Sequence, residues 1–374
     1  MRYLVLLFAV GLLFYPAPAL EGARRGLEVW ALVLLPALFP ASVAAHLLLH
    51  LGLLQTVGRL LEPLMRPLFR LPGHAGLALA MAASSGYLMG AILAGELRRS
   101  GLMTRGEAER FLALGSLANP LFLGGAVAVG MFGNPALPGL LLLAHYLAAL
   151  AVGLLLRFHR YPGEEETRVP SPPSSRSGGP LPARAFGALL REAVESGTAA
   201  LIMAGGVIVT FSSFLGVLAA SGLEGWLSAL LAWGLRALGF HPQGGEALTR
   251  GLFEVTLGAQ AAGALPLPLV ERVTLVSLMA GWGGLSVLAQ AVALLEGTDV
   301  RVGLYALARM LHGFLAAVLT LFLFRPEKHL AAWIQLPAAP AEGPWNGVPW
   351  VLALPLALLA GSGLFRLVQR GGRP

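Results

Sequence analysis

The chain has 374 residues, of which 56% are hydrophobic and 12% charged, and its mean hydropathy is +0.74. Soluble domains carry about 25% charged residues, so this composition excludes a water-soluble globule and predicts an integral membrane protein. The absence of cysteine excludes disulfides, thiolate metal sites and cysteine nucleophiles. The net charge of +7 comes from arginines in short clusters between apolar segments, which is typical of membrane topology signals. We therefore expect a lipid bilayer as partner and no nucleic acid.

The first apolar segments are long enough to cross a bilayer, which takes roughly 17–25 residues. Residues 1–22 are predicted to form an N-terminal transmembrane helix, although Arg2 and Ala17-Pro18-Ala19 also resemble a signal peptide. A second span follows from residue 27. Residues 58–70 place arginine and glutamate at three- or four-residue spacing opposite leucines, which predicts an amphipathic helix on the membrane surface.

Residues 74–97 are apolar but interrupted by Ser84-Ser85-Gly86-Tyr87. Arginines stand on both sides of this segment, so the positive-inside rule places both of its ends in the cytoplasm. A segment that begins and ends on one side is a re-entrant hairpin; if it simply spans, this argument fails. The uncharged residues 112–144 follow, divided into two spans by Phe132-Gly133-Asn134-Pro135.

Residues 158–191 contain three consecutive glutamates and a stretch rich in proline and serine, which predicts a disordered cytoplasmic linker. The second half then repeats the order of the first. It has an uncharged span at 197–223, an amphipathic piece at 224–239, a short apolar piece at 251–265, and spans at 273–295 and 302–324. A polar connection at 326–346 and a C-terminal transmembrane helix with a basic tail at 347–374 complete the chain.

Three local matches, at offsets between 162 and 168 residues, support a duplicated unit; one pairs His145 with His312. Because the first unit has an odd number of crossings, the second would have the opposite orientation. The predicted fold is an all-α polytopic membrane protein. It contains two inverted repeats at 27–157 and 192–325, each with an amphipathic interfacial helix, a re-entrant hairpin and three spanning helices, plus extra N- and C-terminal helices. This is a common plan for secondary transporters.

Polar residues at membrane depth are candidates for function, because placing them there is unfavourable. Ser84, Ser85, Gly86 and Tyr87 would unwind the first hairpin and direct a helix N-terminus into the membrane, which favours anions. Close helix packing through small residues is the alternative. Asn119-Pro120 would interrupt the next span, or merely kink it.

The second half offers matching candidates. Glu254, Thr256 and Gln260 occupy its short hairpin, and a lone carboxylate there is expected to hold a proton or bind a cation. Glu254 is therefore the coupling candidate; an interfacial position near the hairpin mouth is the alternative. The sequence Trp282-Gly283-Gly284-Leu285-Ser286, with Gln290, forms the corresponding interruption of the next span.

No residues suggest catalysis. Phosphate-loop and dinucleotide fingerprints, a serine–histidine–acid set and paired carboxylates at membrane depth are all missing, so we expect neither an enzyme nor a cofactor. His46 and His50 stand four apart without a third ligand and are expected to be interfacial rather than metal-binding. His145 and His312 are expected to share a packing role.

Several motifs resemble one known family. Ser85-Gly86-Tyr87-Leu88-Met89-Gly90-Ala91 and Leu102-Met103-Thr104-Arg105-Gly106-Glu107-Ala108 resemble the YlbJ (SpoVV) sporulation integral membrane proteins, which belong to the wider nucleoside-recognition, or Gate, membrane domains. The likeness continues through Gly130-Met131-Phe132-Gly133-Asn134-Pro135, Gly251-Leu252-Phe253-Glu254 and Trp282-Gly283-Gly284-Leu285-Ser286-Val287. It covers about residues 27–325. The family usually has proline where Leu88 stands here.

The resemblance implies transport of dipicolinic acid across the mother-cell-derived membrane around the forespore. Dipicolinate is a small planar dianion that backbone N–H groups, serines and Asn119 could bind, with Tyr87 stacked on its ring. The substrate-binding candidates are Ser84, Ser85, Gly86, Tyr87, Asn119, Pro120, Gln260, Gly283 and Ser286. The alternatives are a nucleoside or other small solute as substrate, or a non-transporting membrane protein required for spore cortex assembly. Homo-oligomerisation stays open.

Overall fold

The computed structural model describes residues 2–36, 39–40, 43, 47, 53–163 and 183–324, and in these ranges every regular element is helical. The first half contains α1 (Arg2–Phe14), α2 (Pro16–Val29), η1 (Trp30–Leu34), α4 (Leu53–Phe69), α5 (His74–Ser85), α6 (Tyr87–Arg99), α7 (Arg105–Gly115), the π-helix η2 (Leu121–Met131) and α8 (Pro138–Leu156). The second half contains α9 (Ala183–Ala220), α10 (Leu223–Ala237), α11 (Gly244–Phe253), α12 (Val255–Ala264), α13 (Leu269–Trp282), α14 (Gly284–Leu294) and α15 (Val302–Leu323).

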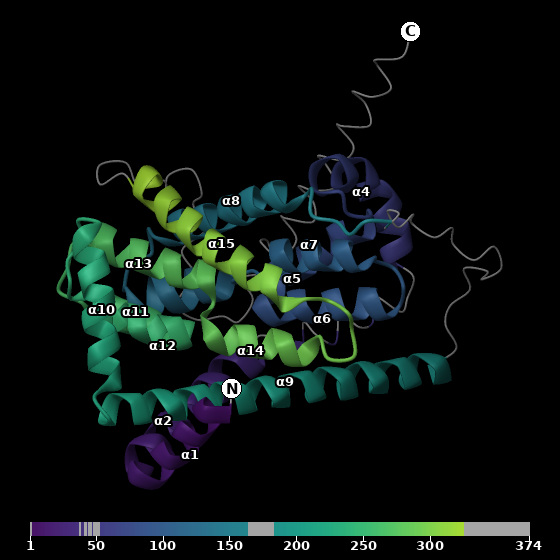
Figure 1. Ribbon diagram of the computed structural model, residues 1–374. Helices are drawn as coiled ribbons and strands as arrows, with labels where there is room; N and C mark the ends of the chain where they lie inside the picture. The colour runs from purple at the N-terminus through teal and green to yellow at the C-terminus, as the bar shows by residue number, and fades with distance from the viewer. Residues whose placement is uncertain are drawn as a thin grey trace.

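Four helical stretches in the described part are long and apolar enough to cross a membrane: Pro138–Leu156, Phe186–Ala220, Leu269–Leu294 and Val302–Leu323. Helix α9 runs along one side of the molecule, where α2 packs against it, and α10 turns away at its end (Figure 1). The exposed side chains of α8 and α15 include many large apolar ones, as expected of surfaces that face lipid. These features confirm an all-helical membrane protein.

Four helices are interrupted inside the protein. Gly86 separates α5 from α6 at a φ of 106°, and Gly283 separates α13 from α14 at a φ of 87°; both angles favour glycine because it has no Cβ. Residues 116–119 are non-helical between α7 and η2, and Glu254 is extended between α11 and α12. The predicted interruptions at Gly86, Asn119 and Gly283 are confirmed.

Three boundaries differ from the predicted ones. The first helix, expected over residues 1–22, divides at Tyr15, because Pro16 begins a new helix and cannot donate the hydrogen bond that would continue α1. Helix α9 begins at Ala183, within the predicted linker, since residues 183–191 are rich in alanine, leucine and arginine, which favour helix. Helix α11 begins at Gly244 rather than 251. Its Arg250 is paired with Glu224 and Glu246 at 2.7 Å each.

Some predictions fall on residues outside the described ranges. They concern the His46 and His50 pair, the centre of the linker at 164–182, the polar connection at 326–346 and the C-terminal helix at 347–374. The amphipathic helix predicted at 58–70 is confirmed as part of α4, which buries Leu61, Met65 and Phe69 along one face.

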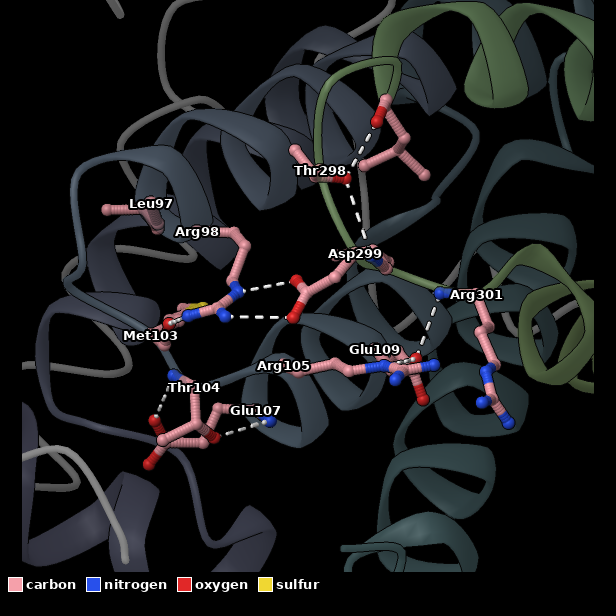
Figure 2. A network of polar contacts seen from close by, with 12 residues as sticks. Leu97, Arg98, Met103, Thr104, Arg105, Glu107, Glu109, Thr298, Asp299 and Arg301 are labelled. Atoms are coloured by element: carbon pink, nitrogen blue, oxygen red, sulfur yellow. Dashed lines mark hydrogen bonds and ion pairs between the residues drawn. The ribbon is translucent and has the colours of Figure 1, made fainter. Parts of the chain in front are cut away.

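A polar network at one end joins the two halves of the chain (Figure 2). Arg98 at the end of α6 forms a bidentate ion pair with Asp299 in the α14–α15 loop, at 2.7 and 2.9 Å. Beside it, the Glu109 carboxylate accepts hydrogen bonds from Arg105 on its own helix and from the main-chain amide of Arg301. Thr104 caps α7 through a reciprocal pair of hydrogen bonds with Glu107.

Candidate functional site

The helix interruptions of the two halves meet at one pocket. The volume between the protein atoms of the pocket is about 510 Å³, and this volume includes space that is open to solvent. Residues 85–88 from the α5–α6 interruption and 254–256 from the α11–α12 interruption line it together. Asn119 and Phe122 come from the α7–η2 segment, Ile208 from α9, and Val287 and Gln290 from α14. Each half therefore contributes both of its interrupted helices.

Asn119 connects two of the interruptions. Its Nδ2 donates to the main-chain oxygen of Ser85 at 3.1 Å, and its Oδ1 accepts from the amide of Phe122 at 2.7 Å. The second bond satisfies an amide in the first turn of η2, which would otherwise lack a partner. Asn119 is 7% exposed, so this buried amide both caps a helix and holds the end of α5 in place.

Glu254 is the only carboxylate among the described residues that line the pocket. Its side chain is 4% exposed, and its Oε2 accepts a hydrogen bond from the amide of Leu257 at 2.8 Å. The carboxylate thus caps the N-terminus of α12, where the helix dipole favours a negative charge. None of the described residues that line the pocket is a lysine, arginine or histidine.

Tyr87 presents its ring to the pocket while its hydroxyl is used elsewhere. The hydroxyl donates to the main-chain oxygen of Ala280 on α13 at 2.7 Å. A Cβ placed on Gly283 would lie 3.7 Å from the Tyr87 ring, so this glycine lies beside the tyrosine. The ring is therefore fixed between the α5–α6 interruption and the α13–α14 interruption.

The structure separates the predicted residues into two groups. Ser85, Gly86, Tyr87, Asn119 and Glu254 line the pocket. The others lie outside its lining. Ser84 donates to the main-chain oxygen of Met81, Gln260 is exposed, Pro120 precedes η2, and Gly283 lies behind the Tyr87 ring. Ser286 is fully buried, and its Oγ has no hydrogen-bond partner among the described residues.

Two further residues were not among the predicted binding residues. Gln290 lines the pocket and is 2% exposed. It stands seven residues after Gly283, which places it on the same helix face two turns later. Arg309 lies fully buried on α15, behind Tyr87, with its guanidinium carbon 5.6 Å from the ring centroid. A single charged residue in the apolar segment 302–324 is the sequence signal that could have identified it.

Comparisons with known proteins agree with this architecture. The Gate family, described as nucleoside recognition, matches residues 31–135. The sporulation integral membrane protein YlbJ of Bacillus subtilis (strain 168) is 37% identical over 322 residues, which cover 83% of this chain and 79% of that protein.

Solved structures of CNTnw, a concentrative nucleoside transporter, are also similar. A doubly substituted form in an outward-facing state has a TM-score of 0.54 and 16% identity, covering 86% of this chain and 85% of that one. The inward-facing substrate-bound state has a TM-score of 0.49 and 17% identity, covering 85% and 83%. At such identity the likeness to the outward-facing form shows a shared fold alone.

Proposed function

Because the chain belongs to the family of the sporulation integral membrane protein YlbJ, we propose that it is a secondary transporter that moves dipicolinic acid into the developing forespore. In a spore former it would act in the mother-cell-derived membrane around the forespore. The observation that carries the proposal is the pocket between the two interrupted hairpins. Interrupted helices around a central pocket are the usual binding architecture of secondary transporters.

An inverted repeat with two re-entrant hairpins belongs to this proposal, and contacts at the two ends of the molecule support it. The outer end of α5 lies beside α4, where the amide of Gly73 donates to Glu62. The outer end of α12 lies near the start of α13, where Arg272 donates to the main-chain oxygen of Gly263 at 2.7 Å. In Figure 1, α4 lies at the right and α13 at the left. The hairpins would thus enter from opposite sides and meet at Gly86 and Glu254.

The pocket offers a small solute several polar contacts. Ser85, Asn119, Gln290 and Thr256 are uncharged donors and acceptors. The first turn of α6 has no side-chain cap; its Met89 amide donates to Gly86, and the amides of Tyr87 and Leu88 are available to a solute. The Tyr87 ring could stack on a planar heterocycle. These groups suit a pyridine ring that carries two carboxylates.

The charge of Glu254 sets a condition on such a substrate. An ionised Glu254 would repel a dianion within a few ångströms, and none of the lining residues that the structure describes carries a positive charge to offset it. We therefore propose that Glu254 is protonated when dipicolinate is bound and that transport is coupled to a proton. A nucleoside carries no negative charge and would not require this.

Uptake of labelled dipicolinate by purified protein in proteoliposomes tests the proposal. We expect saturable uptake above that of protein-free liposomes, competed by unlabelled dipicolinate and not by uridine. Uridine uptake without dipicolinate uptake would instead support the nucleoside alternative, which the Gate match and the shared fold favour. A monodisperse protein that transports neither solute would contradict the proposal and favour a non-transporting role in cortex assembly.

A further inference from the structure

Arg309 is a fully buried arginine whose charge has no carboxylate partner in the described part of the chain. It is 1% exposed and lies on α15. Its guanidinium donates to the main-chain oxygens of Ser116, Ala280 and Trp282, the last two at 3.2 and 3.4 Å. A buried arginine without a counter-ion is strongly unfavourable, so these carbonyls must stabilise it.

The three carbonyl oxygens share a position in the fold. Ser116 directly follows the last residue of α7, and Ala280 and Trp282 belong to the last turn of α13. Both helices end here, inside the protein, where their final carbonyls have no helical partner and the helix dipoles are negative. One guanidinium thus supplies hydrogen-bond donors to the carbonyl oxygens at the ends of two interrupted helices, one helix from each half.

His312 also holds the guanidinium in place. Its Nδ1 lies 2.9 Å from Nη1 of Arg309, and its Nε2 lies 2.9 Å from the main-chain oxygen of His145. Arginine can only donate, so Nδ1 must accept and the proton must be on Nε2. His312 is therefore neutral here.

The two helix ends that Arg309 joins lead directly into the pocket. Three residues after Ser116 stands Asn119, and α14, which carries Gln290, begins two residues after Trp282. The Tyr87 hydroxyl donates to the same Ala280 oxygen that accepts from Arg309. Three pocket side chains thus depend on main-chain segments that Arg309 fixes.

We propose that Arg309 is a positioning residue that aligns the interrupted helices of the two halves, and thereby Asn119, Tyr87 and Gln290, for substrate binding. The inference rests on the proposed transport function for its substrate, but its geometric part is independent of which solute binds. Loss of Arg309 would leave two helix ends free to separate and would weaken binding more than it slows the transport cycle.

Spin labels test the geometric part without a substrate. The chain has no cysteine, so Leu121→Cys on η2 and Val292→Cys on α14 introduce the only two thiols, at side chains that are 57% and 51% exposed. We expect one narrow label-to-label distance in this parent and a broad distribution after Arg309→Met. Arg309→Lys keeps the charge but has fewer donors in a different geometry, so it should fall between the two.

Arg110→Met is the matched control. Arg110 is also buried and also donates to main-chain oxygens, those of Arg70 and His159, but it lies away from the pocket. We expect lower thermal stability with an unchanged distance distribution.

Dipicolinate uptake then tests the link to binding. Arg309→Lys should raise KM at least tenfold and leave Vmax within a factor of two, while Arg110→Met leaves KM unchanged. An unchanged distance distribution in both Arg309 variants, or equal changes in KM for Arg309→Lys and Arg110→Met, would overturn the proposal. If the parent transports no dipicolinate, the proposed substrate fails, whereas the distance measurement still decides the role of Arg309.

Discussion

His145 and His312 lie against each other where α8 and α15 cross, with their ring centroids 4.3 Å apart. Nε2 of His312 donates to the main-chain oxygen of His145, and Nε2 of His145 accepts from the amide of Ala118 in the α7–η2 interruption. Both side chains are buried and bonded to the main chain or to Arg309, in agreement with the packing role expected from the sequence match that pairs them.

Substitutions of His312 should therefore distinguish how much its packing and how much its hydrogen bonds contribute to stability. His312→Leu removes the acceptor for Arg309 and the donor to His145, and we expect it to lower the free energy of unfolding by about 1–3 kcal/mol. His312→Gln can supply both groups and should lose less. Thermal unfolding in detergent measures the difference, and equal losses in the two variants would contradict the assigned bonds.

Asn119→Ala removes the cap of η2 and the bond to Ser85 at the same time. We expect a loss of about 0.5–2 kcal/mol in stability from the cap and a larger proportional loss of dipicolinate uptake, since the side chain also lines the pocket. The double variant with Ser85→Ala should abolish accumulation of dipicolinate in spores. Normal spore dipicolinate at normal protein levels would show that these residues do not bind substrate. Gln260→Ala, on the exposed side of α12, is the control.

The sequence predicted most of the interruptions because glycine, proline and asparagine at membrane depth are recognisable without a structure. It did not distinguish Gln290 from Gln260. Gln260 stands six residues after Glu254 and is therefore on another face of α12, whereas the seven-residue spacing of Gln290 from Gly283 returns it to the same face. That distinction required knowing at which residue each helix begins.

The environment of Arg309 was even harder to predict from the sequence. The main-chain oxygens that accept from it lie more than 25 residues away in the chain, and a carbonyl leaves no signature in the residue type. The sequence favoured an anion site formed by backbone N–H groups, serines and Asn119. In the structure an arginine, Arg309, lies behind the pocket rather than in its lining. The carbonyl oxygens at the ends of α7 and α13 stabilise its charge there.

Glu254→Gln tests proton coupling. Glutamine resembles a protonated glutamate in shape but cannot release a proton, so we expect dipicolinate uptake that no longer responds to a proton gradient. Its Oε1 can still accept from the amide of Leu257, so the cap of α12 should survive. Comparing uptake with and without the gradient in wild type and variant measures this. Equal gradient dependence in both would remove Glu254 as the coupling residue.

Gly86→Ala tests the backbone of the first interruption. At a φ of 106° an added Cβ is strained, so we expect a loss of about 1–3 kcal/mol in stability and reduced uptake. Gly101→Ala provides the comparison, because Gly101 also has a positive φ but lies in a surface turn with open space around it. If both variants reduce uptake equally, backbone strain rather than the position in the pocket is responsible.

The polar network at the start of α7 predicts how stability depends on pH. Burial would raise the pKa of Glu109. Hydrogen bonds from the Arg301 amide, His159, Tyr161 and Arg105 outweigh this effect and hold the pKa below its ordinary value of 4.5. The ionised carboxylate therefore contributes stability that is complete above pH 4.5 and is lost as the pH falls through the lowered pKa.

We accordingly expect Glu109→Gln to lower the unfolding temperature at neutral pH and to have a smaller effect at a pH well below 4.5, where the wild-type carboxylate is also protonated. Asp299→Asn serves as the comparison. Its ion pair with Arg98 is partly exposed, at 48% for the aspartate side chain, so its loss should cost about 1 kcal/mol or less. A Glu109→Gln defect that is equally large at both pH values would mean that the carboxylate acts through packing rather than through its charge. Because the amide of Arg301 belongs to the second half and Glu109 to the first, a charge-dependent defect would also show that this network holds the halves together at this end.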